Sequence, residues 1–217
     1  MKRLFTFLLL GAMISPVAAQ EVEQEVDQEG LAKEILGELS EEAKTYKTVT
    51  IDFSLTIKTT QGKTMQNGKA KAKGSQFYYE TEDRKVYSDG KAVWTFLEEE
   101  EECYIDNLED IGGGINPSEI LTIWENNFKV KYDKEISADV HQIKLYPMDT
   151  EKSKYHTVTI TVNRKTKKVE KAIIKTKENA TVIMNFNSIT PNKEIPDSDL
   201  KWNPAKHGNP DVIDNRM

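Results

Sequence analysis

Apolar and polar side chains alternate most regularly between residues 48 and 57. On one side of this pattern stand Val49, Ile51, Phe53, Leu55 and Ile57, and on the other Thr48, Thr50, Asp52, Ser54 and Thr56. Successive side chains of a β-strand point to opposite faces of the sheet. The segment is therefore predicted to be a strand with one dry face and one wet face.

An earlier segment has the period of a helix, with apolar residues every three to four positions. These residues are Leu31, Ile35, Leu36, Leu39, Ala43 and Tyr46. A single apolar stripe of this kind is stabilised by packing against another element. The pattern predicts an amphipathic helix that begins at Leu31 and lies on another part of the fold.

Turn signals then follow at intervals of eight to twelve residues along much of the chain, separated by short runs rich in Val, Ile, Thr, Tyr and Phe. The signals are Gln61-Gly62, Lys73-Gly74, Glu82-Asp83, Asp89-Gly90, Glu98 to Glu102, Asp149-Thr150, Asn163-Arg164 and Glu178-Asn179. This spacing predicts an antiparallel meander of roughly nine to eleven strands.

Some of these strands carry apolar residues on both faces. The two clearest cases are Val93 and Leu97 against Trp94 and Phe96, and Val182, Met184 and Phe186 against Ile183 and Ile189. Apolar side chains on both faces of a sheet must be kept from water on both sides. The sheet is therefore expected to be covered twice, or to curve around something.

One segment interrupts the meander. After Gly112, Gly113 and Gly114, the run Asn116 to Glu119 offers a helix N-cap, a proline at the first helical position and a glutamate at the third. The apolar stripe of this segment is Ile120, Leu121, Ile123, Trp124 and Phe128. A short helix over 117–128 is predicted, and the glycines make it either a lid that moves on a hinge or a plain irregular loop.

Residues 1–20 have the form of a secretory signal: a charged start, an apolar run from Leu4 to Ile14, and small residues up to Ala19. Cleavage after Ala19 would change the net charge from −6 to −8, and an uncleaved membrane anchor is the alternative. We expect an acidic, disordered tail at 20–29 and one domain at 30–217.

Composition narrows the function. The chain has 217 residues, 37% of them hydrophobic and 30% charged, which is typical of a globular protein and excludes one with many membrane spans. No basic excess indicates nucleic acid. Cys103 is the only cysteine and the three histidines are far apart, so the spacing predicts no metal site and no disulfide. The glutamates at 98–102 are expected to form a solvated hairpin tip rather than a calcium site.

Motifs of enzyme chemistry are missing from the sequence. It contains no Gly-x-Ser-x-Gly elbow, no glycine-rich phosphate loop and no paired histidines at helical spacing. We therefore expect no catalytic residues and no cofactor, although a hydrolase whose residues meet only in three dimensions stays open.

Several motifs together resemble the LolA-type outer-membrane lipoprotein carriers. They are the first helix, the strand at 49–57, Gly74-Ser75-Gln76-Phe77, the Asp89-Gly90 turn that leads to Trp94-Thr95-Phe96, Asn116-Pro117, and the closing run Pro204 to Asp214. The resemblance extends over roughly residues 30–215.

The resemblance implies a mainly β fold: a curved, half-open antiparallel barrel with an N-terminal helix and a mid-chain lid helix on its concave face. It also implies a monomeric periplasmic carrier that receives acylated lipoproteins from an inner-membrane ABC-type release complex and passes them to an outer-membrane acceptor. Acyl chains leave water favourably, by about 0.8 kcal/mol per methylene, so such a carrier needs an apolar concavity.

On this basis the candidate acyl-binding residues are apolar side chains of the early strands and of the mid-chain segment, with the three glycines as the lid hinge. The candidates are Phe53, Leu55, Phe77, Tyr79, Trp94, Phe96, Ile120, Leu121 and Trp124. Ordinary core packing is the alternative for each of them. The family's lid-latching arginine is replaced by Tyr78, whose hydroxyl is one possible substitute.

Two other functions stay open at this stage. One is a periplasmic sensor module of the same fold that holds a free lipid or a peptide and transports nothing. The other is a structural or assembly protein of the envelope, whose complexes would not depend on lipid.

Overall fold

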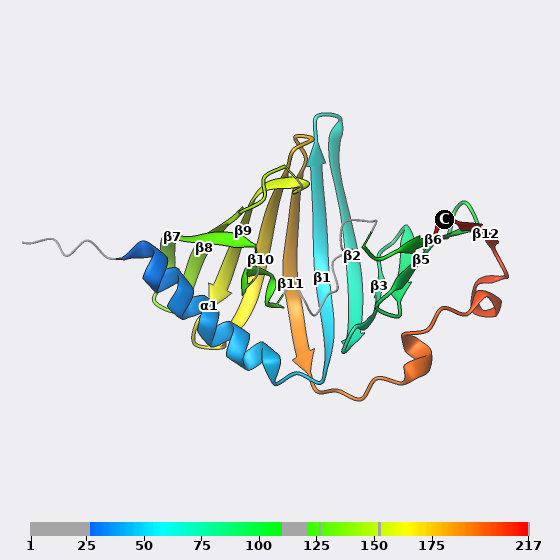
Figure 1. The fold of residues 1–217 in the computed structure, drawn as a ribbon, viewed down its shortest axis with the longest axis horizontal. Helices are drawn as coiled ribbons and strands as arrows, with labels where there is room; N and C mark the ends of the chain where they lie inside the picture. The colour runs from blue at the N-terminus through cyan, green and yellow to red at the C-terminus, as the bar shows by residue number, and fades with distance from the viewer. Residues whose placement is uncertain (1–26, 110–120, 126, 152, 217) are drawn as a thin grey trace, which may run out of the picture.

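The computed structural model describes residues 27–109, 121–125, 127–151 and 153–216. Within them, twelve strands form one open, curved sheet, and a helix crosses one of its faces (Figure 1). The sheet is not closed into a barrel, because its two outermost strands, β12 and β7, do not pair. The predicted half-open fold is confirmed.

The strands follow one another mostly as hairpins. Their bounds are β1 (Thr48–Thr59), β2 (Gly62–Lys73), β3 (Gln76–Glu80), β4 (Arg84–Ser88), β5 (Ala92–Leu97), β6 (Glu102–Asn107), β7 (Phe128–Ser137), β8 (Val140–Pro147), β9 (Tyr155–Asn163), β10 (Lys168–Thr176), β11 (Thr181–Pro191) and β12 (Asp211–Asp214). Their spatial order is β12-β6-β5-β4-β3-β2-β1-β11-β10-β9-β8-β7. The eight predicted turns all fall at connections between strands.

The helix α1 (Gln28–Lys44) begins three residues before the predicted start. The Asp27 carboxylate accepts hydrogen bonds from the backbone N–H groups of Glu29 and Gly30, which caps the first turn. Residues 28 and 29 of the predicted tail therefore belong to the helix, and the rest of that tail before Asp27 lies outside the described residues. The buried side of α1 follows the predicted stripe: Ala32, Ile35, Leu36, Leu39 and Ser40.

We call the face of the sheet under α1 the concave face and the opposite face the convex face. The main core lies between α1 and the concave face, where Ile35 of the helix and Ile143 and Leu145 of β8 are all completely buried. Val49 and Ile51 of β1 point into the same core. The alternation in the sequence therefore identified the dry face of β1 correctly.

A β-bulge changes one predicted pattern. Asp52 pairs with Ser188, but the next residue, Phe53, pairs with Phe186, so Asn187 is an extra residue in β11. Such an insertion shifts the alternation of side chains by one. Ile189 is therefore buried in the main core on the same face as Phe186, and the prediction that these two residues oppose each other is wrong.

A second cover lies on the convex face. We call residues 192–216 the C-terminal strap, which contains two 3-10 turns, η3 (Asp197–Asp199) and η4 (Pro204–His207), and β12. Trp202 and His207 of the strap pack against Phe96 of β5, with ring centroids 5.9 and 4.9 Å from that of Phe96. Lys71 of β2 forms an ion pair with Asp199 at 2.8 Å. The strap thus covers the convex face around Phe96, which explains the two-sided apolar pattern of β5.

Only part of the predicted mid-chain helix is described. Residues 110–120, with Gly112, Gly113, Gly114 and Ile120, lie outside the described residues. The 3-10 turn η2 (Ile123–Glu125) follows, and Asn127 then takes a φ of 62°. Such a φ ends a right-handed helix. Phe128 is therefore the first residue of β7, and the prediction that it is the last residue of a helix is wrong.

Candidate functional site

The central strands extend beyond the helix. β1, β2, β10 and β11 run past α1 to hairpin tips at the far edge of the sheet (Figure 1). Their concave-face side chains there are apolar, partly exposed, and packed against the edge of the main core. We call this the concave apolar surface, and its residues are Leu55, Ile174, Met184 and Phe186.

The register brings these residues together. Leu55 of β1 is the direct partner of Met184 of β11, and Met184 in turn pairs with Ala172 of β10. Ile174 lies two residues further along β10. Apolar side chains that are left partly in water on neighbouring strands form a surface to which an apolar ligand can bind with a gain in free energy.

Small residues on β2 make room beside this surface. Gly68, Ala70 and Ala72 are the Cα partners of Phe53, Ile51 and Val49 on β1. The large side chains of β1 therefore lie beside a part of β2 whose concave-face side chains are no larger than a methyl group. On the next strand, β3, Phe77 and Tyr79 stack with ring centroids 6.4 Å apart.

The segment 121–125 packs on the C-terminal half of α1. The indole Nε1 of Trp124 donates a hydrogen bond to Ser40 Oγ at 2.9 Å, and both residues are buried. Glu125 forms an ion pair with Lys44 at 3.0 Å, and the hydrogen bond from Lys44 lowers the pKa of the Glu125 carboxyl. The helix and this segment are therefore fastened to each other.

A small cavity lies between the end of α1, Leu121 and the strands β1 and β2. It has a volume of about 90 Å³, and Ala43, Tyr46, Val49, Ala72 and Leu121 are among its lining residues. A space of this size holds a few atoms of a ligand and not a whole acyl chain. Most of the room for a larger ligand would have to come from the open end of the concave face.

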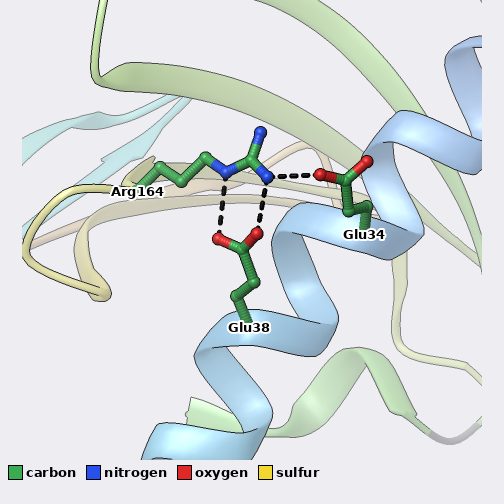
Figure 2. A network of polar contacts seen from close by, with 3 residues as sticks. All are labelled: Glu34, Glu38 and Arg164. Atoms are coloured by element: carbon green, nitrogen blue, oxygen red, sulfur yellow. Dashed lines mark hydrogen bonds and ion pairs between the residues drawn. The ribbon is translucent and has the colours of Figure 1, made fainter.

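An arginine from the sheet holds the other half of α1. Arg164, in the turn between β9 and β10, lies between Glu34 and Glu38 of the helix (Figure 2). Its Nε donates to Glu38 Oε2 at 2.9 Å and its Nη2 to Glu38 Oε1 at 2.5 Å, a two-pronged contact. This bonding lowers the pKa of the Glu38 carboxyl and raises that of the arginine. The position of α1 over the sheet is thus set by charged contacts as well as by packing.

The nine predicted binding residues do not form one surface. Phe53, Leu55, Phe77 and Tyr79 share the concave face, and Leu121 and Trp124 pack onto the main core beside them. Trp94 and Phe96 alternate with Val93 and lie on the convex face instead, where the strap contacts Phe96. A single concave site therefore does not include Trp94 and Phe96, and Ile120 lies outside the described residues.

Three residues of the concave apolar surface were missed as candidates. Met184, Phe186 and Ile174 come from the second half of the chain, which the family motifs do not emphasise. The alternation of residues 182–186 was the available signal. It indicates a dry face but does not say that the helix leaves this end uncovered.

Tyr78 does not take the place of a latch on the concave face. It lies on the convex face as the partner of Tyr87, and its hydroxyl donates a hydrogen bond to Glu80 Oε2 at 2.6 Å. Burial and this bond raise the pKa of the Tyr78 hydroxyl. Ser40 and Lys44 of α1 instead form polar contacts with segment 121–125.

Within the described ranges, no three His, Cys, Asp or Glu side chains are arranged so that they could hold a metal ion. The helices of this part of the chain include none that is long and apolar enough to cross a membrane. The glutamate run is the β5–β6 turn, where Glu98 pairs with Lys85.

Comparison with solved structures finds matches at very low sequence identity, of which the first below supports a similar fold. An uncharacterized conserved protein from Thermus thermophilus superposes with a TM-score of 0.57 at 8% identity, covering 85% of this chain and 99% of the other. A LolA superfamily protein from Nitrosomonas europaea has a TM-score of 0.45 at 10% identity, covering 79% and 97%. A search of curated proteins finds no match.

Comparison with protein families gives a direct match. The family model described as outer membrane lipoprotein carrier protein LolA matches residues 44–202, from the end of α1 to Trp202 in the strap. This is well over half of the 217 residues. It includes β1 to β11 and with them the concave apolar surface. The chain therefore belongs to the LolA family of outer membrane lipoprotein carrier proteins.

Proposed function

We propose that this protein is a periplasmic carrier without catalytic activity that binds the acyl chains of lipoproteins on its concave face. The observation that carries the proposal is the concave apolar surface, where Leu55, Met184, Phe186 and Ile174 are partly exposed at the end of the sheet that α1 leaves open. Acyl chains gain free energy when they leave water for such a surface. Family membership supports a lipidated cargo.

The proposal also assigns a route. The leader at 1–19 takes the protein to the periplasm, where it receives acylated lipoproteins from an inner-membrane ABC-type complex and delivers them to an outer-membrane acceptor. It acts as a monomer. Cargo entry would shift α1 without loss of the sheet, because the strands pair independently of the helix.

The site is tested by a pair of variants on neighbouring residues of β11. Met184→Asp places a carboxylate on the concave apolar surface, whereas Asn185→Asp places one on the convex face. Native mass spectrometry of protein purified from periplasm without detergent measures the bound acylated lipoprotein. We expect one-to-one complexes for the wild type and Asn185→Asp, and bare protein for Met184→Asp, with unchanged circular dichroism in all three.

Equal loading of Met184→Asp and the wild type would contradict the assigned surface. A wild-type protein that carries only free lipid would contradict the shuttle and favour a lipid-binding module. Complexes with lipoprotein that persist after the acyl chains are removed would favour an assembly protein.

A further inference from the structure

The convex face carries an unusual row of charges near the hairpin tips. At these tips the register aligns Lys175 of β10, Thr181 of β11, Lys58 of β1 and Lys63 of β2 as consecutive Cα partners. We call these four residues the lysine row. It lies at the end of the sheet farthest from the C-terminal half of α1 (Figure 1).

In the part of the chain that the structure describes, the three lysines have no acidic partner. All three side chains are exposed, and within the described ranges none of them forms an ion pair. Neighbouring strands lie about 4.8 Å apart, so the three residues fall within roughly 15 Å. Lys58 and Lys63 stand directly opposite each other, an arrangement of like charges that destabilises a strand pair. An anionic partner would remove this repulsion.

A second row lies directly beside the first. On each of the four strands, the residue two positions closer to the middle of the sheet belongs to this second row. Its members are Ile173, Ile183, Thr56 and Met65. We call them the apolar row. Met65 is 63% exposed, and Ile173 and Ile183 are partly exposed.

The next row on the same face is polar again. It consists of Lys171, Asn185, Ser54 and Asn67. On these four strands, the apolar side chains of this end of the convex face are thus confined to one band beside the lysines. A band of exposed apolar residues next to a row of cations is typical of a surface that lies in the headgroup region of a bilayer.

We propose that the lysine row and the apolar row together dock on a bilayer that contains anionic phospholipid. The ammonium groups of Lys58, Lys63 and Lys175 would bind lipid phosphates, and Met65 and the two isoleucines would enter the headgroup region. The attraction is local, since the whole chain has a net charge of −6. The lysines alone would attract either an acidic protein or an anionic bilayer. The adjacent apolar row favours the bilayer, because its side chains can enter the hydrocarbon next to the lipid headgroups.

This surface is distinct from the proposed cargo site, and the inference does not rest on the carrier function. The lysine row and the concave apolar surface occupy opposite faces of the same strands, at the same end of the sheet. Docking by the convex face would leave Leu55 and Met184 accessible from the concave side. A protein bound in this way could exchange an apolar ligand close to the membrane.

The experiment is co-sedimentation of the full mature protein with vesicles free of any lipoprotein. One set consists of phosphatidylcholine, and the other contains phosphatidylglycerol at about one third. We expect binding to the anionic vesicles that weakens as salt increases from about 50 to 300 mM. Lys58→Gln, Lys63→Gln and Lys175→Gln combined should lower the partition coefficient about 100-fold. Met65→Ser should lower it several-fold at all salt concentrations.

A matched variant controls for net charge. Lys91→Gln, Lys165→Gln and Lys201→Gln combined removes the same charge from exposed positions outside the row, and should change binding less than about threefold. The proposal is overturned if the wild type fails to bind anionic vesicles, or if both triple variants lose binding equally. Vesicle binding that is unaffected by Met65→Ser would also contradict the proposal, because the apolar row would then contribute nothing to docking. None of these results bears on whether Met184→Asp loses its cargo.

Discussion

The ring of Phe53 lies directly on the backbone of Gly68. A Cβ atom at position 68 would be only 2.3 Å from Cζ and 2.5 Å from Cε2 of the ring, and 2.7 Å from the carbonyl oxygen of Glu80 on the next strand. A glycine is thus required at position 68, because the Phe53 ring packs directly against its backbone on the concave face. The two residues are also direct partners in the β1–β2 register.

Gly68→Ala should therefore destabilise the protein by about 1–3 kcal/mol, the usual cost of overpacking a well-packed site. Urea unfolding followed by circular dichroism measures this change. Phe53→Leu removes the ring, so the double variant should lose less stability than the sum of the two single variants. The recovery should be incomplete, because the clash with the Glu80 carbonyl remains. Additive effects would show that the ring does not rest on Gly68.

The Arg164 contact with Glu34 and Glu38 predicts a loss of stability when the arginine is replaced. Arg164→Met should lower the free energy of unfolding by about 1 kcal/mol, because Arg164 and Glu38 are only partly buried, Glu34 is exposed, and water screens their attraction. Arg84→Met is a suitable control, since the ion pair of Arg84 is with Asp83, its neighbour in the chain, and does not involve α1. An equal loss in the control would argue against a role in holding α1.

The same contact predicts a pH dependence. The hydrogen bond from Arg164 lowers the pKa of Glu38 in the folded protein. A carboxyl with a lowered folded pKa stabilises the fold above its unfolded pKa of about 4.3, and this stabilisation is lost as the pH falls through the folded value. The difference in melting temperature between wild type and Arg164→Met should accordingly shrink from pH 6 to pH 3. A constant difference would point to packing by the arginine stem.

The buried hydrogen bond between Trp124 and Ser40 predicts coupling between α1 and segment 121–125. Ser40→Ala leaves the indole N–H without its acceptor in a buried place, which should cost about 1–3 kcal/mol. Trp124→Phe removes the donor, so adding Ser40→Ala to it should cost much less than Ser40→Ala alone. A double-mutant cycle in urea measures the difference. An absence of coupling would mean that the two elements are held only by apolar contact.

Local patterns in the sequence are sufficient to predict where the strands and turns lie. Alternation located the dry face of β1, and Gly, Asn and Asp marked the turns, because both signals depend on residues close in the chain. The bulge at Asn187 has no such local signal: the extra residue is set by the pairing of Phe53 with Phe186 across the sheet. It therefore reversed the predicted side of Ile189.

The candidate site could be predicted only in part for a similar reason. The sequence shows that Trp94 and Phe96 share a face, and that Phe53 and Phe77 lie on dry strands, but not which faces adjoin. Their separation depends on the strap, in which Trp202 and His207 pack against Phe96 although they follow it by about 100 residues in the chain. No pattern within the strands indicates that their second apolar face is already covered by the chain's own end.

The strap itself should respond to pH through His207. Its ring stacks on Trp202 with centroids 4.8 Å apart, and its Nε2 lies 3.1 Å from the Tyr87 hydroxyl. Burial lowers the pKa of His207, and Lys85 and Lys206 act in the same direction while Glu98 opposes them. Below about pH 6.5 the unfolded chain therefore binds a proton that the folded strap resists, so the stability of the strap should fall with pH until the folded pKa is reached.

The reactivity of Cys103 can measure how often the strap detaches from the sheet. Its side chain is completely buried on the convex face, on the strand β6 to which β12 of the strap pairs. Burial raises the pKa of its thiol to about 11, so it should react slowly with a maleimide in the closed state. The ratio of labelling rates between wild type and His207→Gln cancels the direct effect of pH on the thiol, and should rise as the pH falls from 7.5 to 5.5. His156→Gln, at an exposed position in β9, should follow the wild type at every pH. A ratio that stays constant would show that protonation of His207 does not loosen the strap.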